Sequence, residues 1–541
     1  MPTTGDRQPA ATEHALEQAL ARWLPAQRWF AGKGRPITGL QITSDTELAA
    51  GGGGEPALRH LIVAVTQGTG TDSYQVLVGL RASLPTRLEH VRIGVVPDGR
   101  SAYDALHDTE LAGLLLRGIA EQQVIGPVRF ARVTGGRLDG GPLTDGPLSP
   151  RALASGAGPD SLVLTGEQSN TSLVYGEEAI LKVFRRVAAG PNPDLEVSAA
   201  LGRLGATHIA EPFGWMETGA GVELTILAIL SRYLRAASDG WSLAATSVRD
   251  LYAQPDTDAA EAGGDFAGEA RRLGAATAEV HRDLVTAFGA DDLPPGATGE
   301  LAGPMRHRLA DALTAVPELG EHAAMLTAAY AELAGLDEPV RVQRIHGDYH
   351  LGQVMRTQTG WVMLDFEGEP AVPLATRRAR SSPLRDVAGM LRSFDYAARH
   401  QLLDRPDRAA LERPARGWVR RNREAFCAGY AEVGGAIDPR KHEVLLRAFE
   451  LDKAVYEVMY EARNRPSWLS IPLDSLAAMS AARPDSVAEA DSDSGARSDS
   501  VAEADSDSGA RPDSRAEADS DSRASPASGA EAGPDSGTEV R

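Results

Sequence analysis

The sequence HGDYHLGQ (residues 346–353) is followed closely by DFEGE (residues 365–369). Between them lies VMRTQTGWVML, in which two short apolar runs flank the turn signal Thr-Gln-Thr-Gly, and this pattern predicts a β-hairpin. A hairpin folds the chain back on itself, so we expect Asp348 and Asp365 to face one cavity. Two carboxylates that converge with the side-chain amide of Gln353 are typical of metal-assisted phosphoryl transfer.

In that chemistry each of these three residues has a predicted role. Asp348 accepts the proton of the attacking hydroxyl, while Asp365 and the amide oxygen of Gln353 bind Mg²⁺. A turn-forming aspartate is the alternative for Asp348, but it leaves the other two residues and the hairpin unexplained. The sequence has no His/Cys cluster with the spacing of a zinc site. Further along, Asp386 begins an apolar helix after Ser-Pro, and we expect it to bind nearby backbone groups and to support the loop around Asp348.

Lysine is rare in this chain. Of its 55 basic residues only four are lysines, namely Lys33, Lys182, Lys441 and Lys453, so each one indicates a place where a compact ammonium is needed. Lys182 lies in AILKVF, which alternates as a half-buried strand does, and Glu196 follows in a helix-compatible segment. We predict that these two residues pair and place one positive charge against the phosphates of a nucleotide. An ordinary surface pair is the alternative.

The turn GEQSNTS (residues 166–172) lies where a phosphate-covering loop is expected. It lacks the GxGxxG pattern, but short polar residues can still donate backbone and hydroxyl hydrogens to phosphate. A plain hairpin turn has the same appearance. The predicted phosphate-binding residues are Gln168, Ser169, Asn170 and Thr171.

A second candidate surface is the polar face of a predicted helix over residues 450–464. Two tyrosines one turn apart among charged groups suit a polyhydroxylated ligand, by stacking and hydrogen bonding. A solvated face with an intrahelical Lys453–Glu457 pair is the alternative. The predicted substrate-binding residues are Lys453, Glu457, Tyr460 and Arg463, together with His350 beside Asp348.

The 541 residues leave room for two or three domains. A helix followed by β-like runs predicts an N-terminal α+β domain over residues 1–100, in which the segment around Trp29 and Lys33 acts either as a lid or as a local core. Residues 101–235 predict a β-rich lobe, and residues 236–480 a mainly helical lobe that contains the opening motif. The predicted fold class is therefore α+β.

The remaining residues, 481–541, form an acidic repeat with a period of fourteen residues. From Asp485 onward there are 15 acidic residues and five arginines, so this segment supplies about −10 of the net charge of −20. With almost no apolar residues it is predicted to be disordered, and a partner-binding tail is the alternative. No basic patch with interleaved aromatic residues is present, which argues against nucleic-acid binding.

Cellular location is predicted from what the sequence contains. The single cysteine, Cys427, fits a reducing compartment, and the polar N-terminus lacks the apolar core of a signal peptide. No apolar run reaches the length of a membrane span. We therefore expect a cytoplasmic protein, without membrane contact and monomeric.

These motifs carry a family resemblance. HGDYHLGQ with DFEGE resembles the aminoglycoside-phosphotransferase-like branch of the eukaryotic-type kinase fold. Four longer strings resemble actinobacterial maltokinases: LPAQRWFAGKGR (24–35), FEGEPAVPL (366–374), LRDVAGMLRSFDYAA (384–398) and ELDKAVYEVMYEARNRPSWLSIPL (450–473). The resemblance covers residues 12–477 and leaves out the acidic repeat.

The resemblance implies a bilobal kinase with an N-terminal cap domain, with ATP and Mg²⁺ as cosubstrate and cofactor. It implies phosphorylation of maltose at the anomeric hydroxyl, which gives maltose 1-phosphate for α-glucan and glycogen synthesis, and a functional link to a maltosyltransferase or a trehalose synthase. By position it assigns Asp348, Lys182 and Asp365 the roles given above. Two departures stand out: Gln353 replaces the Asn of most kinases, and the phosphate loop is poor in glycine.

Two other functions stay open. A related kinase acting on glucosamine or an aminoglycoside is the first, although a polycationic aminoglycoside calls for a strongly acidic site and the helix around Lys453 is mixed in charge. The second is a non-catalytic, sugar-sensing pseudokinase. This alternative is disfavoured because Lys182, Asp348 and Asp365 are all present.

Overall fold

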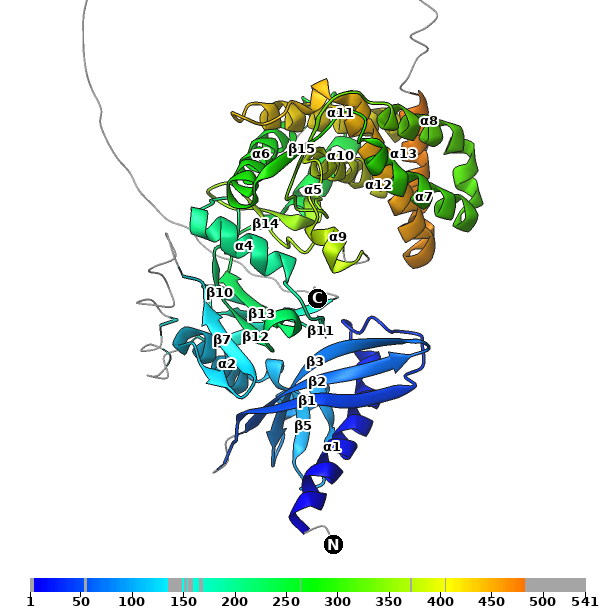
Figure 1. Ribbon diagram of the computed structural model, residues 1–541. Coiled ribbons are helices and arrows are strands. Elements are labelled where there is room, and N and C mark those ends of the chain that lie inside the picture. Colours follow the sequence, from blue (N-terminus) through cyan, green and yellow to red (C-terminus); the bar gives the residue numbers. More distant parts are fainter. Residues whose placement is uncertain are drawn as a thin grey trace, which may run out of the picture. The chain divides into compact units, whose positions relative to one another are not determined.

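The computed structural model describes residues 4–52, 56–134, 148–149, 153, 159–164, 169–262, 264–369, 372–403 and 405–481 (Figure 1). The acidic repeat and Gln168 lie outside the described residues, so the predictions made for them stay predictions. The predicted domain limits near residues 100, 235 and 480 also stay predictions. Within the described ranges, no helix combines the length and apolar character needed to cross a membrane.

The first element is helix α1 (Thr4–Trp23), which packs against an antiparallel sheet (Figure 1). The sheet has the strand order β1-β2-β3-β5-β4. The strands are β1 (Gly39–Ala49), β2 (Ala57–Gln67), β3 (Gly70–Arg81), β4 (Arg92–Val95) and β5 (Ser101–Asp104). Trp29 and Phe30 are buried against Tyr74 of β3, so of the two alternatives the aromatic segment forms a local core.

A second sheet carries Lys182. Its strand order is β6-β7-β12-β13-β10-β9-β8, and every pairing is antiparallel. The strands are β6 (Val124–Ile125), β7 (Val128–Arg132), β8 (Ser161–Val163), β9 (Asn170–Tyr175), β10 (Ala179–Phe184), β12 (Pro212–Thr218) and β13 (Thr225–Arg232). Helix α2 (Thr109–Glu121) packs against β7, and helix α4 (Pro193–Leu204) follows β10.

The first sheet is joined to the second just beyond Lys182. Strand β11 (Arg186–Val187) pairs with β3, and the side-chain amide of Gln75 on β3 donates to the backbone oxygens of Phe184 and Leu227, each at 2.5 Å. Arg185 is 1% exposed; it donates to Asp104 (2.5 Å) and lies 4.7 Å from the Trp29 ring. The strand that bears Lys182 is therefore held at its end by the N-terminal sheet.

The rest of the described chain is mainly helical and shares one apolar core. The helices are α5 (Gly240–Tyr252), α6 (Ala267–Phe288), α7 (Gly299–Ala315), α8 (Ala323–Ala334), α9 (Leu374–Arg378), α10 (Leu384–His400), α11 (Arg408–Ala431), α12 (Glu443–Asn464) and α13 (Ser470–Ala481). The short strands are β14 (Ser238–Asp239), β15 (Ala290–Leu293), β16 (Val340–Gln343), β17 (Val354–Arg356) and β18 (Trp361–Met363). Strands β17 and β18 pair antiparallel, which confirms the predicted hairpin. The predicted α+β class, with a β-rich lobe before a helical lobe, is also confirmed (Figure 1).

Arg185 and its neighbour Arg186 form a matched pair for a stability measurement. Arg185→Met leaves the buried Asp104 without its cation, so we expect the free energy of unfolding to fall by about 3–5 kcal/mol. Arg186 is 57% exposed and pairs with Asp72 at the surface, so Arg186→Met is expected to cost about 0–1 kcal/mol. Urea unfolding followed by circular dichroism measures both values. Equal losses would show that the buried pair contributes no more than the exposed one.

Candidate active site

The loop that carries Asp348 is held by a buried carboxylate. Asp386, 2% exposed at the start of α10, accepts hydrogen bonds from the backbone N–H groups of His346 (2.7 Å) and Gly347 (2.9 Å). His281 of α6 lies 3.0 Å from the same carboxylate. The structural role predicted for Asp386 is thus confirmed. Gly347 takes a positive φ of 86°, a conformation that side-chain-bearing residues rarely adopt.

The hairpin brings Gln353 and Asp365 together. The amide nitrogen of Gln353 lies 3.5 Å from Asp365 Oδ2, and rotating the amide by 180° brings its oxygen to the same place. Asp365 has a φ of 63°, which is uncommon for a residue other than glycine and is a form of backbone strain often found at functional sites. The ring of His346 packs on Phe366, which ties the Asp348 loop to the segment after β18.

Lys182 lies among three carboxylates. Its ammonium is 3.1 Å from Asp194, 2.7 Å from Asp365 and 2.6 Å from Glu367. Burial alone lowers the pKa of Lys182, but the three acids outweigh it and hold the pKa well above its ordinary value. The ammonium is therefore charged, and it connects the second sheet with the segment after β18.

The prediction that Glu196 pairs with Lys182 is wrong. Asp194 pairs with the lysine, whereas Glu196 pairs with Arg344 (3.0 Å) and Arg378 (2.6 Å). Both acids belong to the first turn of α4, which Asn192 caps by accepting from the N–H of Leu195. Residues two apart on an α-helix point about 200° away from each other, so only one of the two acids can face β10.

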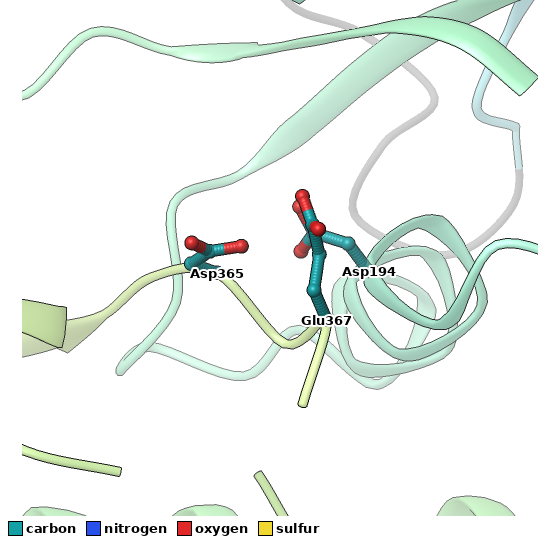
Figure 2. A group of neighbouring side chains, drawn as sticks. All are labelled: Asp194, Asp365 and Glu367. Atoms are coloured by element: carbon teal, nitrogen blue, oxygen red, sulfur yellow. The ribbon is translucent and has the colours of Figure 1, made fainter. Parts of the chain in front are cut away.

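The carboxylates around Lys182 fit a divalent cation. Oxygens of Asp194, Asp365 and Glu367 all lie within 4.8 Å of one another, and the side chains converge from α4 and from the segment after β18 (Figure 2). Burial raises the pKa of Glu367, with Lys182 opposing it and the neighbouring acids adding to it. Burial also acts to raise the pKa of Asp365, but Lys182 lowers that pKa overall. Among the described residues, Glu367 Oε1 has an ion pair but no hydrogen bond. This all-oxygen set, with Gln353 beside it, suits the hard ion Mg²⁺.

The predicted phosphate-binding turn is described only in part. Ser169 is exposed, and Asn170 begins β9 in a partly exposed position. The Thr171 side chain is 6% exposed and its hydroxyl accepts a hydrogen bond from Arg185 (2.8 Å). That hydroxyl is turned towards the N-terminal sheet, which does not support a phosphate contact by the Thr171 side chain.

The residues predicted to bind the ligand on α12 fall into two groups: Lys453 and Glu457 pair with other charged side chains, whereas Tyr460 and Arg463 are exposed. Lys453 donates to Asp348 (3.2 Å) and to Glu369 (3.1 Å), so it contacts the loop that carries Asp348 and the segment after β18. Glu457 accepts from the buried Arg392 (2.6 Å), and Lys453 forms its salt bridges with Asp348 and Glu369, so the alternative of an intrahelical Lys453–Glu457 salt bridge is not what the structure shows. Tyr460 is 43% exposed, and Arg463 is exposed as well.

The charge on Asp348 follows from its neighbours. Burial alone would raise the pKa of this carboxyl, but the Lys453 ammonium, followed by His350 and His346, lowers it overall. Burial in turn lowers the pKa of His350, which keeps that imidazole neutral near pH 7. Asp348 is therefore an ionised carboxylate beside a neutral histidine, the state required of a general base.

Sequence reasoning missed several residues of the site. Asp194, Glu367 and Glu369 each contact Lys182 or Lys453, and two of them were visible in the motif DFEGE. The sheet face around Lys182 was also missed. Directly opposed residues share one face, and the register places Ser172 and Ile229 opposite Lys182.

Known proteins share these features. Residues 23–108 match the family model described as the maltokinase N-terminal cap domain. A glucosamine kinase of Streptacidiphilus jiangxiensis is 30% identical over 324 residues, which cover 57% of this chain and 70% of that protein. A glucosamine kinase of Mycolicibacterium smegmatis is 30% identical over 339 residues, or 58% of this chain and 78% of that protein.

The chain belongs to the glucosamine kinase family. Members of that family with solved structures share its fold. A glucosamine kinase in complex with glucosamine, ADP and inorganic phosphate superposes with a TM-score of 0.58 at 23% identity, over 86% of this chain and 98% of the other. A second crystal form of a glucosamine kinase gives a TM-score of 0.60, over 86% and 99%. The bilobal kinase fold that the motifs implied is confirmed.

The support of the Asp348 loop by Asp386 is open to a direct test. Asp386→Ala leaves the buried N–H of His346 and the part-buried N–H of Gly347 without an acceptor, so we expect the free energy of unfolding to fall by about 2–5 kcal/mol. Asp291→Ala is the control, because Asp291 is 68% exposed and pairs with Arg380 at the surface. Urea denaturation of both variants measures the difference. A loss for Asp386→Ala no larger than that of the control would contradict the supporting role.

Proposed function

We propose that this chain is an ATP-dependent sugar kinase that phosphorylates maltose at its anomeric hydroxyl. The observation that carries the kinase chemistry is the joining of Lys182, Asp365 and Gln353 at one place, next to a loop that presents an ionised Asp348. The match of residues 23–108 to the maltokinase cap domain supports maltose as the acceptor. The proposed setting is the cytoplasm, with maltose 1-phosphate supplied to α-glucan synthesis through a maltosyltransferase.

The donor follows from Lys182 and its sheet. A single buried ammonium next to a carboxylate cluster is suited to hold the α- and β-phosphates of a nucleotide. The face of the sheet around it combines the apolar Ile180, Val174 and Ile229 with small polar residues, which suits a flat base above the phosphates. A glucosamine kinase of the same fold binds ADP, which supports ATP as the donor.

The proposed reaction uses the residues as follows. Asp348 takes the proton of the sugar hydroxyl while the hydroxyl oxygen bonds to the γ-phosphorus, and the bond from that phosphorus to the bridging oxygen breaks, which releases ADP. Asp365 and Gln353, with Glu367 or Asp194, would hold Mg²⁺, which would neutralise charge on the phosphates. Lys182 contributes a fixed positive charge that is already in place before the reaction.

The charges beside Asp348 favour a neutral acceptor. Glu369 pairs with Lys453 and Arg385, Asp452 pairs with Arg308, and Glu457 pairs with Arg392, so each of these acids already has a cation. An ammonium-bearing sugar gains most where a carboxylate is uncompensated. Maltose carries no charge and needs only hydrogen bonds and stacking, which the exposed Tyr460 can supply. Glucosamine remains the second candidate, because the relatives named above are glucosamine kinases.

A panel of acceptors tests the proposal. ADP release is measured with maltose, glucose, glucosamine and kanamycin, in the wild type and in Asp348→Asn. We expect release with maltose, and a turnover about 10²–10⁴-fold lower in the variant because the general base is lost. ADP release with an amino sugar alone would exclude maltose as the acceptor. Wild-type turnover in Asp348→Asn would exclude Asp348 as the general base.

The two acids of α4 form a second test. Asp194→Asn removes one charged partner of Lys182, so we expect the KM for ATP to rise about tenfold. Glu196→Gln leaves the Lys182 cluster intact and is expected to change that KM less than about threefold. Steady-state kinetics at saturating acceptor give both values. The reverse order of effects would restore Glu196 as the partner of the nucleotide-binding lysine.

A further inference from the structure

Lys453 joins three elements at the catalytic loop. Its ammonium extends from α12 and lies 3.2 Å from Asp348 Oδ1 and 3.1 Å from Glu369 Oε1. The lysine side chain is 20% exposed and Glu369 is 3% exposed, so most of this contact is shielded from water. A charge pair in such a place is screened little by salt, and it holds its groups more firmly than a surface pair does.

The lysine is itself held in place on its far side. Glu369 Oε2 lies 3.5 Å from Arg385 at the start of α10, so Glu369 is positioned by a second cation. The Tyr456 ring, one turn further along on the same side of α12, lies 4.7 Å from the Lys453 ammonium. Two of the three N–H donors of the ammonium are therefore already used by carboxylates, and one of these carboxylates, Glu369, has a second cation beside it.

The two oxygens of Asp348 differ as a result. Oδ1 is engaged by Lys453, whereas Oδ2 has no hydrogen bond among the described residues. A general base must keep one oxygen available for the acceptor hydroxyl, and its carboxylate must not rotate away from it. The geometry at Oδ1 meets both requirements.

We propose that Lys453 is a positioning residue for Asp348: it fixes the orientation of the carboxylate and keeps it ionised, so that Oδ2 faces the acceptor. This inference rests on the proposed function, because it assigns Asp348 the part of general base. It replaces the sequence-based expectation that Lys453 binds the sugar. It also gives a physical reason for a cation here: the Lys453 ammonium lies between the partly exposed Asp348 and the buried Glu369 and donates to both.

The charged groups around the pair agree with this assignment. Asp348 is faced by Lys453 from α12 and by His346 and His350 from its own loop, and Lys453 makes the largest contribution against the effect of burial on the pKa of Asp348. Lys453 is faced by Asp348, Glu369 and Glu457; burial works against its charge, but these acids raise its pKa. Since His350 is neutral near pH 7, Lys453 is the principal cation next to Asp348 at that pH.

Two variants of Lys453 that differ in charge test the proposal. Lys453→Arg keeps a cation, whereas Lys453→Gln keeps a hydrogen-bond donor without the charge; Lys441→Gln, at an exposed lysine outside the site, is the control. For each variant, kcat and the KM values for ATP and the acceptor are measured between about pH 5 and pH 9. Circular dichroism confirms the fold.

We expect Lys453→Gln to lower kcat about 100-fold, with little change in the KM for the acceptor, because a misplaced base slows the chemical step. Without the cation the pKa of Asp348 rises, so the pH below which activity falls moves upward. Lys453→Arg is expected to retain the wild-type acid limb, and Lys441→Gln to behave as wild type.

Other outcomes overturn the proposal. A raised KM for the acceptor with an unchanged kcat and acid limb would make Lys453 a sugar ligand, and unchanged kinetics would leave it no role. If Lys453→Gln does not fold, Lys453→Arg decides, because it keeps the cation beside Asp348: an upward shift of the pH below which its activity falls contradicts the proposal. A wild type that phosphorylates no sugar removes the proposed function itself, which these variants do not address.

Discussion

The buried ammonium of Lys182 is the interaction on which the rest of the site depends. A charge taken out of water is costly unless it is paired, and here three carboxylates from two separate parts of the chain supply the pairing. The strand β10 carries this charge, the first turn of α4 brings one carboxylate to it and the segment after β18 brings two, so the three parts of the chain are held together. The same carboxylates outnumber the cation, which leaves negative potential where Mg²⁺ is proposed to bind.

Around this centre, other ion pairs link the β-rich and helical lobes. Glu196 of α4 holds Arg344, four residues before Asp348, and Arg378 of α9. Asp386 of α10 accepts hydrogen bonds from the backbone of the Asp348 loop, and Lys453 of α12 donates to the Asp348 side chain. Asp348 is therefore positioned by residues from three helices, which is the kind of preorganisation that the proposed phosphoryl transfer requires. Gln75 and Arg185 fix the end of β10 to the N-terminal sheet. The N-terminal sheet therefore contacts the strand that carries Lys182.

Much of this arrangement was predictable because it depends on local sequence. The hairpin between Gln353 and Asp365 follows from two apolar runs around a turn, and the support by Asp386 follows from an acid at the start of an apolar helix. The long motifs indicated a maltokinase-like kinase, and residues 23–108 match the maltokinase N-terminal cap domain. Contacts between distant elements were not predictable in the same way. Spacing alone did not distinguish Asp194 from Glu196, since both acids stand in the first turn of one helix.

The sequence by itself determined the chemical groups of this protein and their order: a lysine on a strand, an acid-bearing loop after a hairpin, and a lysine on a late helix. Only the tertiary structure decided which groups meet. The rotation of α4 about its axis is set by burial of its apolar side, and that rotation turns Asp194 towards Lys182 and Glu196 towards Arg344. The packing of α12 likewise brings Lys453 to Asp348 and not to a free surface. Charge pairing acts over a few ångströms, so it is settled by helix packing and not by position along the chain.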